Sequence, residues 1–370
     1  MRPTPDGASP HDDARDAREQ RDQHATAQDA VAGRAADLRR RLAELPLDIE
    51  HARCAVGGVA VPSYPDGPRP SSTITLAGRG STGRGEHVGW TEEAHRACAR
   101  RIERLSSGGA TRVGDFATRI AHELGDPYDR AALEAAAIDL ALRQADSNLF
   151  RLSGCAPRPL RYVLSFERVA DPITRAQQEL AANPALGLKV DVDPAWRDAT
   201  FAALAALDRV CVLDFKLSGS VADHERAHRL LPAALLEDPL PAAEPWSDSL
   251  RARLSLDAAI GSAAAIAQQN PPPVAVNVKP ARIGGVLAAL DVVAACATRG
   301  IAVYVGGMFE VGVGRTQLHA LAALLCPDAP NDVAPITLAG RDAVRPPRLD
   351  ASNARAGFAN DVGNDVGNDE

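Results

Sequence analysis

The chain has 370 residues, of which 45% are apolar and 24% charged, and its formal net charge is −7. Its length and composition are ordinary for a globular protein of about two domains. The acidic balance argues against a nucleic-acid-binding protein that depends on overall charge, because phosphate neutralisation needs clustered lysines and arginines. No apolar run reaches the roughly 18 residues that span a bilayer, so we expect no membrane contact.

Both ends of the chain are polar and indicate segments outside the folded core. Residues 1–45 predict a disordered or exposed charged arm, and residues 346–370, with a repeated Asp-Val-Gly-Asn pattern, predict a disordered polar tail. The arm lacks the apolar segment of a secretory signal, and the six cysteines form no C-x-x-C pair. These features predict a cytoplasmic protein with reduced, buried thiols rather than disulfides or a zinc site.

Residues 46–155 predict an α+β capping domain. Strand-like runs occur at 72–80 and 83–90, after which the apolar residues recur at the spacing of helices. The last helical stretch is rich in alanine and leucine and is expected to be well buried. The expected helices are residues 91–105, 113–124 and 128–145.

Between residues 156 and 345, short apolar runs alternate with amphipathic helical stretches, which predicts βα units and a parallel sheet. Eight such units favour a (β/α)8 barrel over an open doubly wound sheet, and no G-x-G-x-x-G motif follows an early strand. The predicted strands are residues 162–166, 187–192, 210–215, 233–238, 253–257, 274–279, 301–307 and 335–340.

Charged residues end several of these predicted strands, and active sites of such barrels form at the C-terminal strand ends. The third, fourth and fifth strands end in Asp214, Glu237 and Asp257, and the sixth ends in Lys279. Converging carboxylates raise one another's pKa values unless a hard cation such as Mg²⁺ or Mn²⁺ binds them. A lysine beside that metal suits removal of a proton α to a carboxylate, with the metal stabilising the enediolate.

Five stretches match the pattern of a known family: GRGE (83–86), AALEAAAIDLAL (131–142), LLEDP (235–239), NVKPARIGG (277–285) and VGGMFEVGVGR (305–315). They resemble the enolase superfamily, nearest its muconate-lactonising-enzyme and o-succinylbenzoate-synthase subgroup. The resemblance covers residues 48–345 and implies an α/β fold, an enolase-like modified (β/α)8 TIM barrel with an N-terminal α+β cap. It also implies that Mg²⁺ is bound by Asp214, Glu237 and Asp257, with Lys279 as an acid/base.

The chain departs from this subgroup at two strand ends. The second strand of the subgroup usually reads Lys-x-Lys with the second lysine catalytic, whereas this chain has Lys189 and Asp191. The third strand often reads Asp-x-Asn, whereas here Lys216 follows Asp214 by two residues. We therefore expect Lys216 or Lys189 to be the partner of Lys279. If Lys279 alone is competent, one-base dehydration is favoured over racemisation, which needs a group on each face of the substrate.

Other residues are candidates for binding the substrate. Asp191 shares a strand face with Lys189, although it can instead cap the next helix. Gly306 and Gly307 let the backbone approach the substrate or make a tight turn. Glu310 is expected near the site or in a loop hydrogen bond, and His87 lies in a cap loop of the kind that closes over substrate in the family.

These observations predict an enzyme, a lyase or isomerase that epimerises, cycloisomerises or dehydrates a small carboxylate. The expected partners are that substrate and further copies of the chain in a homo-oligomer, with no nucleic acid or membrane. One alternative is a catalytically impaired protein that binds a metal or small acid. Another is a barrel lyase that forms a Schiff base at Lys279.

Overall fold

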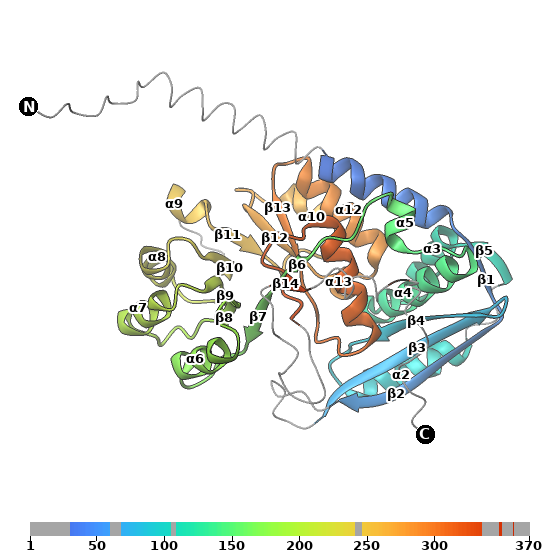
Figure 1. Cartoon of the computed structure of the whole chain (residues 1–370), viewed down its shortest axis with the longest axis horizontal. Coiled ribbons are helices and arrows are strands. Elements are labelled where there is room, and N and C mark those ends of the chain that lie inside the picture. Colours follow the sequence, from blue (N-terminus) through green and yellow to red (C-terminus); the bar gives the residue numbers. More distant parts are fainter. Residues whose placement is uncertain are drawn as a thin grey trace, which may run out of the picture.

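The computed structural model describes residues 30–59, 68–104, 109–240, 246–334, 348–349 and 358. Figure 1 shows two regions side by side, an antiparallel sheet with helices from the first half of the chain and a curled parallel sheet from the second. Within the described residues, no helix combines the length and the apolar character needed to cross a membrane.

The cap is built on a three-stranded antiparallel sheet in the order β2-β3-β4, and β1 pairs antiparallel with β5. Its longest helix, α4, lies against β4 because Gly83 and Gly85 carry no side chain there. A Cβ atom at Gly85 would collide with the carbonyl of Ala132 in α4. The cap elements are β1 (Pro46–Ile49), β2 (His51–Val59), β3 (Arg69–Gly78), β4 (Ser81–His87), α2 (Glu92–Arg104), β5 (Gly109–Arg112), α3 (Val113–Glu123), α4 (Pro127–Gln144) and α5 (Leu149–Ser153).

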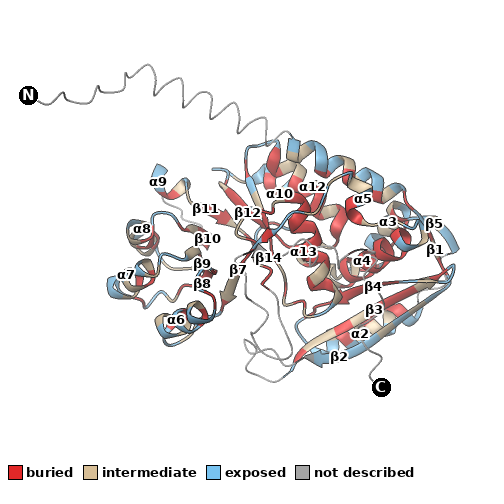
Figure 2. Cartoon of the chain, in the orientation of Figure 1, coloured by how far each residue is buried: buried red, intermediate tan, exposed pale blue. Residues whose placement is uncertain are grey.

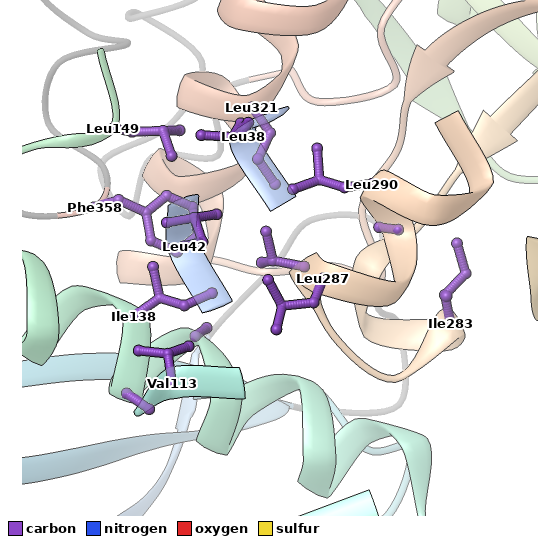
Figure 3. Close-up of a cluster of buried hydrophobic side chains, with 14 of the residues drawn as sticks. Leu38, Leu42, Val113, Ile138, Leu149, Ile283, Leu287, Leu290, Leu321 and Phe358 are labelled. Atoms are coloured by element: carbon purple, nitrogen blue, oxygen red, sulfur yellow. The ribbon is translucent and has the colours of Figure 1, made fainter. Parts of the chain in front are cut away.

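Residues 30–44 form a helix that belongs to the core, so the prediction of an exposed arm is wrong for this part of the chain. Leu38 and Leu42 lie one turn apart on the same helix face, and both are fully buried. Figure 3 shows them packed beside Leu287, Leu321 and Phe358. Phe358 is itself buried, which corrects the predicted polar tail at that position.

The second region is a seven-stranded parallel sheet in the order β13-β12-β11-β10-β9-β8-β7, with helices between the strands. Figure 2 shows α6, α7 and α8 with one exposed face each, whereas α4 and α13 are buried along most of their length. The elements are β6 (Leu160–Arg161), β7 (Val163–Phe166), α6 (Pro172–Ala182), β8 (Gly187–Asp191), α7 (Asp198–Ala206), β9 (Val210–Ser218), α8 (Val221–Leu230), β10 (Leu235–Pro239), α9 (Asp248–Arg251), β11 (Leu254–Leu256), α10 (Ala263–Gln268), β12 (Ala275–Val278), α11 (Pro280–Ile283), α12 (Val286–Ala297), β13 (Ala302–Val305), α13 (Val313–Leu325) and β14 (Arg348–Leu349).

A short segment connects the two edge strands of this sheet and completes the barrel. Asn331 bridges to Tyr162 beside β7, and Asp332 bridges to Gly306 after β13. The backbone N–H of Val163 donates to Asn331 at 2.8 Å, and that of Asp332 donates to Val305 at 2.8 Å. The predicted barrel with an N-terminal α+β cap is thus confirmed. Residues 331–332 take the place of an eighth barrel strand and are called the closing stave below. The predicted eighth strand, 335–340, lies outside the described residues.

One carboxylate ties the cap to the barrel. Glu86 in β4 accepts hydrogen bonds from the backbone N–H groups of Val311 at 2.7 Å, Gly312 at 2.9 Å and Gly314 at 3.0 Å. These groups lie at the N-terminus of α13, where the helix dipole favours a negative charge. Glu86 therefore orients the loop between β13 and α13, which lies beside the strand ends.

We predict that Glu86→Ala lowers the free energy of unfolding by about 1–3 kcal/mol, because it leaves buried N–H groups without their charged acceptor. Urea unfolding followed by circular dichroism measures this change. The control is Glu44→Ala on the exposed face of the first helix, which should change stability by less than about 0.5 kcal/mol. Equal effects of the two substitutions would contradict the role of Glu86 as the tie between the regions.

Candidate active site

The C-terminal ends of the parallel strands gather charged side chains at one end of the barrel. The register aligns Asp191 with Asp214 between β8 and β9, and Asp214 with Glu237 between β9 and β10. Asp257 follows β11 directly and Lys279 follows β12. The predicted convergence of side chains at these strand ends therefore has a structural basis in the pairing of the strands.

Lys189 lies at the centre of this group and is fully buried. Its Nζ atom is 2.5 Å from Glu237 Oε1, 3.1 Å from Asp214 Oδ2 and 3.1 Å from Asp332 Oδ2. Burial alone would lower the pKa of Lys189, but Asp332, Glu237 and Asp214 together hold it well above its usual range. These three carboxylates favour the charged form of Lys189, which connects β8 to β9, β10 and the segment of residues 331–332.

Glu237 is held by neutral donors as well as by Lys189. The hydroxyl of Tyr304 donates to Oε2 at 2.5 Å, and Asn277 Nδ2 lies 3.3 Å from Oε1. Burial and the nearby Asp214 and Asp257 raise the pKa of Glu237 to about 8 in spite of Lys189. The raised pKa means that the carboxylates near Glu237, together with its burial, outweigh the effect of the nearby lysines.

Asp257 and Lys279 form an ion pair with a distance of 2.8 Å, and Arg282 contacts the other oxygen of Asp257. Both side chains of the pair are buried. Asp238 fixes this strand end, because its carboxylate accepts from the backbone N–H groups of Asp257 at 2.8 Å and Ala258 at 2.9 Å. Arg282 is thus held in place by its ion pair with Asp257.

Lys216 and Asp191 are brought together on adjacent strand ends. Lys216 Nζ contacts Asp214 and lies 3.3 Å from Asp191 Oδ1. Burial and Asp214 raise the pKa of Asp191 to about 6, although Lys216 lowers it. The next helix, α7, begins after Arg197, and it is Asp193 that accepts from the backbone N–H of Ala195. Asp191 therefore belongs with the strand-end cluster and does not cap that helix.

Three strand ends of this region have strained backbone. Lys216, Asp238 and Phe309 have φ angles of 50°, 43° and 70°, in the left-handed region that non-glycine residues rarely adopt. Such conformations cost about 1–3 kcal/mol each and persist where the surrounding contacts over-determine them. Lys216 and Asp238 lie among the last residues of β9 and β10, and Phe309 lies in the loop after β13, so the strained positions gather at the C-terminal end of the barrel.

The other predicted site residues have varied surroundings. Gly306 is required for close packing, since a Cβ atom there would lie 2.9 Å from Lys279 Cε. Gly307 lies against Glu310, whose carboxylate accepts from the backbone N–H of Met308 at 2.8 Å, so Glu310 shapes its own loop. His87 is fully buried in the cap, where it contacts His95 and Asp129 instead of the strand ends. Their roles in substrate binding stay predictions.

Sequence reasoning missed three residues that contact the cluster: Asp332, Asn277 and Tyr304. Asn277 precedes Lys279 by two residues, and Tyr304 precedes Gly306 by two, so strand alternation would have placed each pair on one face. Asp332 lies in a closing stave of two bridged residues without an apolar run, and no sequence signal points to it.

The donor set of the three predicted metal ligands suits Mg²⁺, which prefers carboxylate oxygens. The described cluster carries an excess of two negative charges at full ionisation, which a divalent cation would balance. Within the part of the chain that the structure describes, these three carboxylates do not form a set with one oxygen each all within 4.8 Å of one another, and Lys189 and Lys279 pair with their oxygens. A carboxylate oxygen that already pairs with a lysine still has a second lone pair with which it can bind a metal. The carboxylates counted are Asp191, Asp214, Glu237, Asp238, Asp257 and Asp332, and the cations are Lys189, Lys216, Lys279 and Arg282.

Comparison with known proteins agrees with this architecture. Residues 40–152 match the N-terminal domain model, and residues 156–339 the C-terminal domain model, of a family described as "Domain of unknown function (DUF8230)". The chain is similar to an N-succinylamino acid racemase of Amycolatopsis sp., with 34% identity over 149 residues, 37% of this chain and 40% of the racemase. The chain therefore spans about two fifths of that relative's length.

A shorter match, 51% identical over 49 residues, covers 13% of this chain and 13% of an o-succinylbenzoate synthase of Listeria innocua. Among solved structures, a dipeptide epimerase of Methylococcus capsulatus complexed with Mg ion matches with a TM-score of 0.66 and 20% identity, over 78% of this chain and 92% of the epimerase.

A member of the enolase superfamily from Enterococcus faecalis matches with a TM-score of 0.64 and 21% identity, over 78% of this chain and 86% of that one. At these identities the solved structures establish the fold, and the predicted enolase-like fold is confirmed. The two family models together cover most of the chain. The chain therefore belongs to the DUF8230 family and has the enolase-superfamily fold, an α/β barrel with an N-terminal α+β cap.

Proposed function

We propose that the chain is an enzyme, a Mg²⁺-dependent lyase or isomerase that removes a proton α to the carboxylate of a small acid. One observation carries the proposal: three carboxylates on consecutive strand ends have a lysine at each side. Lys216 pairs with Asp214 at one side, and Lys279 pairs with Asp257 at the other. Mn²⁺ is a second metal that this donor set suits.

The names of the relatives support this reaction class. They are a racemase, an o-succinylbenzoate synthase and a dipeptide epimerase, and one structure of the epimerase was determined with Mg and the dipeptide L-Arg-D-Lys. All of these names fit chemistry at a carbon beside a carboxylate or amide carbonyl. We extend to this chain only the class of reaction and a small carboxylate substrate.

Asp214, Glu237 and Asp257 would hold the metal, which supplies charge stabilisation for an enediolate when bound. Lys279 takes or returns the α-proton at Nζ, because its buried ion pair with Asp257 fixes where the amine points. Lys189 is a positioning residue, since its three carboxylate partners keep it charged. Lys216, between Asp191 and Asp214, stays protonated and donates to the substrate carboxylate. With one base and one charged partner, cycloisomerisation or dehydration is favoured over epimerisation.

A catalytically impaired protein that binds a metal or small acid is the second candidate. The replacement of the second-strand lysine by Asp191 favours it, because Lys216 has a left-handed φ near the end of β9 and a side chain that is 45% exposed. In that case the metal and the acid would bind without exchange of the α-proton. Metal binding and proton exchange therefore have to be measured separately.

We predict that the purified protein binds Mg²⁺ saturably and that Glu237→Gln weakens this binding at least tenfold, because it removes a charged ligand from the central strand end. Isothermal titration calorimetry measures the affinity. The matched control is Glu310→Gln, which changes a buried glutamate that bonds its own loop and should keep the affinity within about twofold. Equal affinities of all three proteins would refute the predicted ligand set.

We also predict that the protein exchanges the α-proton of a bound acid in D₂O, with N-acylamino acids and dipeptides as the first substrates to screen by NMR. Lys279→Met should slow the exchange about 10²–10⁴-fold, the usual contribution of a general base. Lys216→Met should keep the exchange of a bound acid but weaken the binding of that acid. If Mg²⁺ binds yet no acid that also binds undergoes exchange, the binding-protein alternative is correct.

A further inference from the structure

A second group of metal-ligating side chains lies inside the cap, on three elements that the proposed reaction does not use. His87 ends β4, Cys98 lies in α2 and Asp129 lies in the first turn of α4. One ligand atom from each lies within 4.8 Å of the others, and it is the one set of three such residues found in the described parts of the chain. All three side chains are at most 1% exposed.

The contact between His87 and Asp129 is close but poorly satisfied. His87 Nε2 is 3.0 Å from Asp129 Oδ1, yet neither atom has a partner in hydrogen-bond geometry, and Asp129 Oδ2 also lacks one. Arg101, which is 38% exposed, forms an ion pair with Asp129 from the surface side. The imidazole nitrogen and the other carboxylate oxygen thus face each other in a buried contact without good hydrogen-bond geometry, which a shared metal ion would satisfy.

The contacts of two neighbouring histidines define what metal binding would change. His95 Nε2 lies 3.0 Å from the carbonyl of Gly89, which can only accept, so Nε2 carries the proton and Nδ1 accepts from the Ser72 hydroxyl at 2.7 Å. His87 Nδ1 lies 3.2 Å from His95 Nδ1 and accepts from the backbone N–H of Gly89 at 3.4 Å. His87 Nε2 therefore carries the proton in the metal-free protein and faces Asp129 Oδ1. A metal ion bound at Nε2 would displace that proton.

We propose that His87, Cys98 and Asp129 form a Zn²⁺-type metal site that is separate from the Mg²⁺ site of the barrel. A thiolate with an imidazole selects Zn²⁺ or Co²⁺ over Mg²⁺, and Oδ1 of Asp129, which faces His87, would be the third ligand. The second nitrogen of His87 lies against His95 and the backbone N–H of Gly89, which fix the orientation of the ring. The thiolate and the carboxylate together carry two negative charges, and Arg101 pairs with the other oxygen of the same carboxylate.

The Cys98 thiol must lose its proton to solvent when the metal binds. Without metal, its hydrogen bond to Cys54 and its burial keep the pKa of Cys98 well above its usual range, so the thiol is protonated. Metal binding would connect β4, α2 and α4 just before Val88, which packs against Met308 of the barrel loop. The proposed site therefore stabilises the edge of the cap that faces the strand ends.

The test is a titration of the full-length, chelator-treated protein with Co²⁺ in the presence of excess Mg²⁺, which keeps the barrel carboxylates occupied. We expect one Co²⁺ per chain, a near-ultraviolet thiolate-to-cobalt charge-transfer band, displacement of Co²⁺ by Zn²⁺, and a rise in Tm with Zn²⁺. Cys98→Ala and His87→Gln should lose the band and the rise in Tm. The matched controls are Cys296→Ala and His319→Gln, which change a buried cysteine and histidine elsewhere and should keep both.

Three results would overturn the proposal. The first is wild-type protein without a charge-transfer band, which would mean that a buried imidazolium–carboxylate pair occupies the cluster. The second is a band that persists in Cys98→Ala. The third is Co²⁺ binding that is lost in Glu237→Gln, which would assign the ion to the barrel. If Cys98→Ala does not fold, Cys98→Ser with its circular dichroism spectrum and His87→Gln decide the question.

Discussion

Six carboxylates meet at the C-terminal end of the barrel, and the ammonium of Lys189 holds the central ones together. Its partners Asp214 and Glu237 belong to β9 and β10, and Asp332 belongs to the two-residue stave that closes the barrel. Removing one partner from such a buried group leaves uncompensated charge at a cost of about 3–5 kcal/mol. The same ion pairs that assemble the site therefore also help to close the barrel, so site and fold depend on one interaction.

The end of β4 links the cap to this site through three consecutive residues. Gly85 lies against α4, Glu86 accepts from the start of α13, and His87 reaches back to Asp129 of α4. Successive side chains of a strand point to opposite faces, which is why Glu86 faces the barrel loop while its neighbours face the cap. GRGE (83–86), one of the five stretches that carry the family resemblance, therefore also connects the two regions, and the next residue, His87, belongs to the proposed cap metal site.

The strand ends of the site were predictable because parallel strands of similar length place their last residues at one level. This is why Asp214, Glu237 and Lys279 could be selected from apolar runs and their spacing. Asp332 could not, since its stave has no apolar run and is defined by pairing alone. The His87, Cys98 and Asp129 group was equally invisible, because its members come from three elements with no common spacing, and scattered cysteines had indicated no zinc site. Leu38 and Leu42 show that a short apolar face within a charged segment is enough to dock a helix.

The exchange of a lysine between neighbouring strands has a specific physical consequence. Asp191 and Asp214 are directly paired between β8 and β9, so a lysine two residues beyond Asp214 can reach the space above Asp191. The exchange lowers the formal charge of the two strand ends by one, since Asp191 replaces a lysine and Lys216 replaces a neutral residue. It also changes the mobility of the amine, because Lys216 has a left-handed φ near the end of β9 and its side chain is 45% exposed, whereas Lys279 is buried beside Asp257. A base must be held at one place relative to the α-carbon, whereas a charged group that binds a carboxylate tolerates motion. The exchange therefore argues for Lys279 as the proton-transfer residue and for Lys216 as a binding residue.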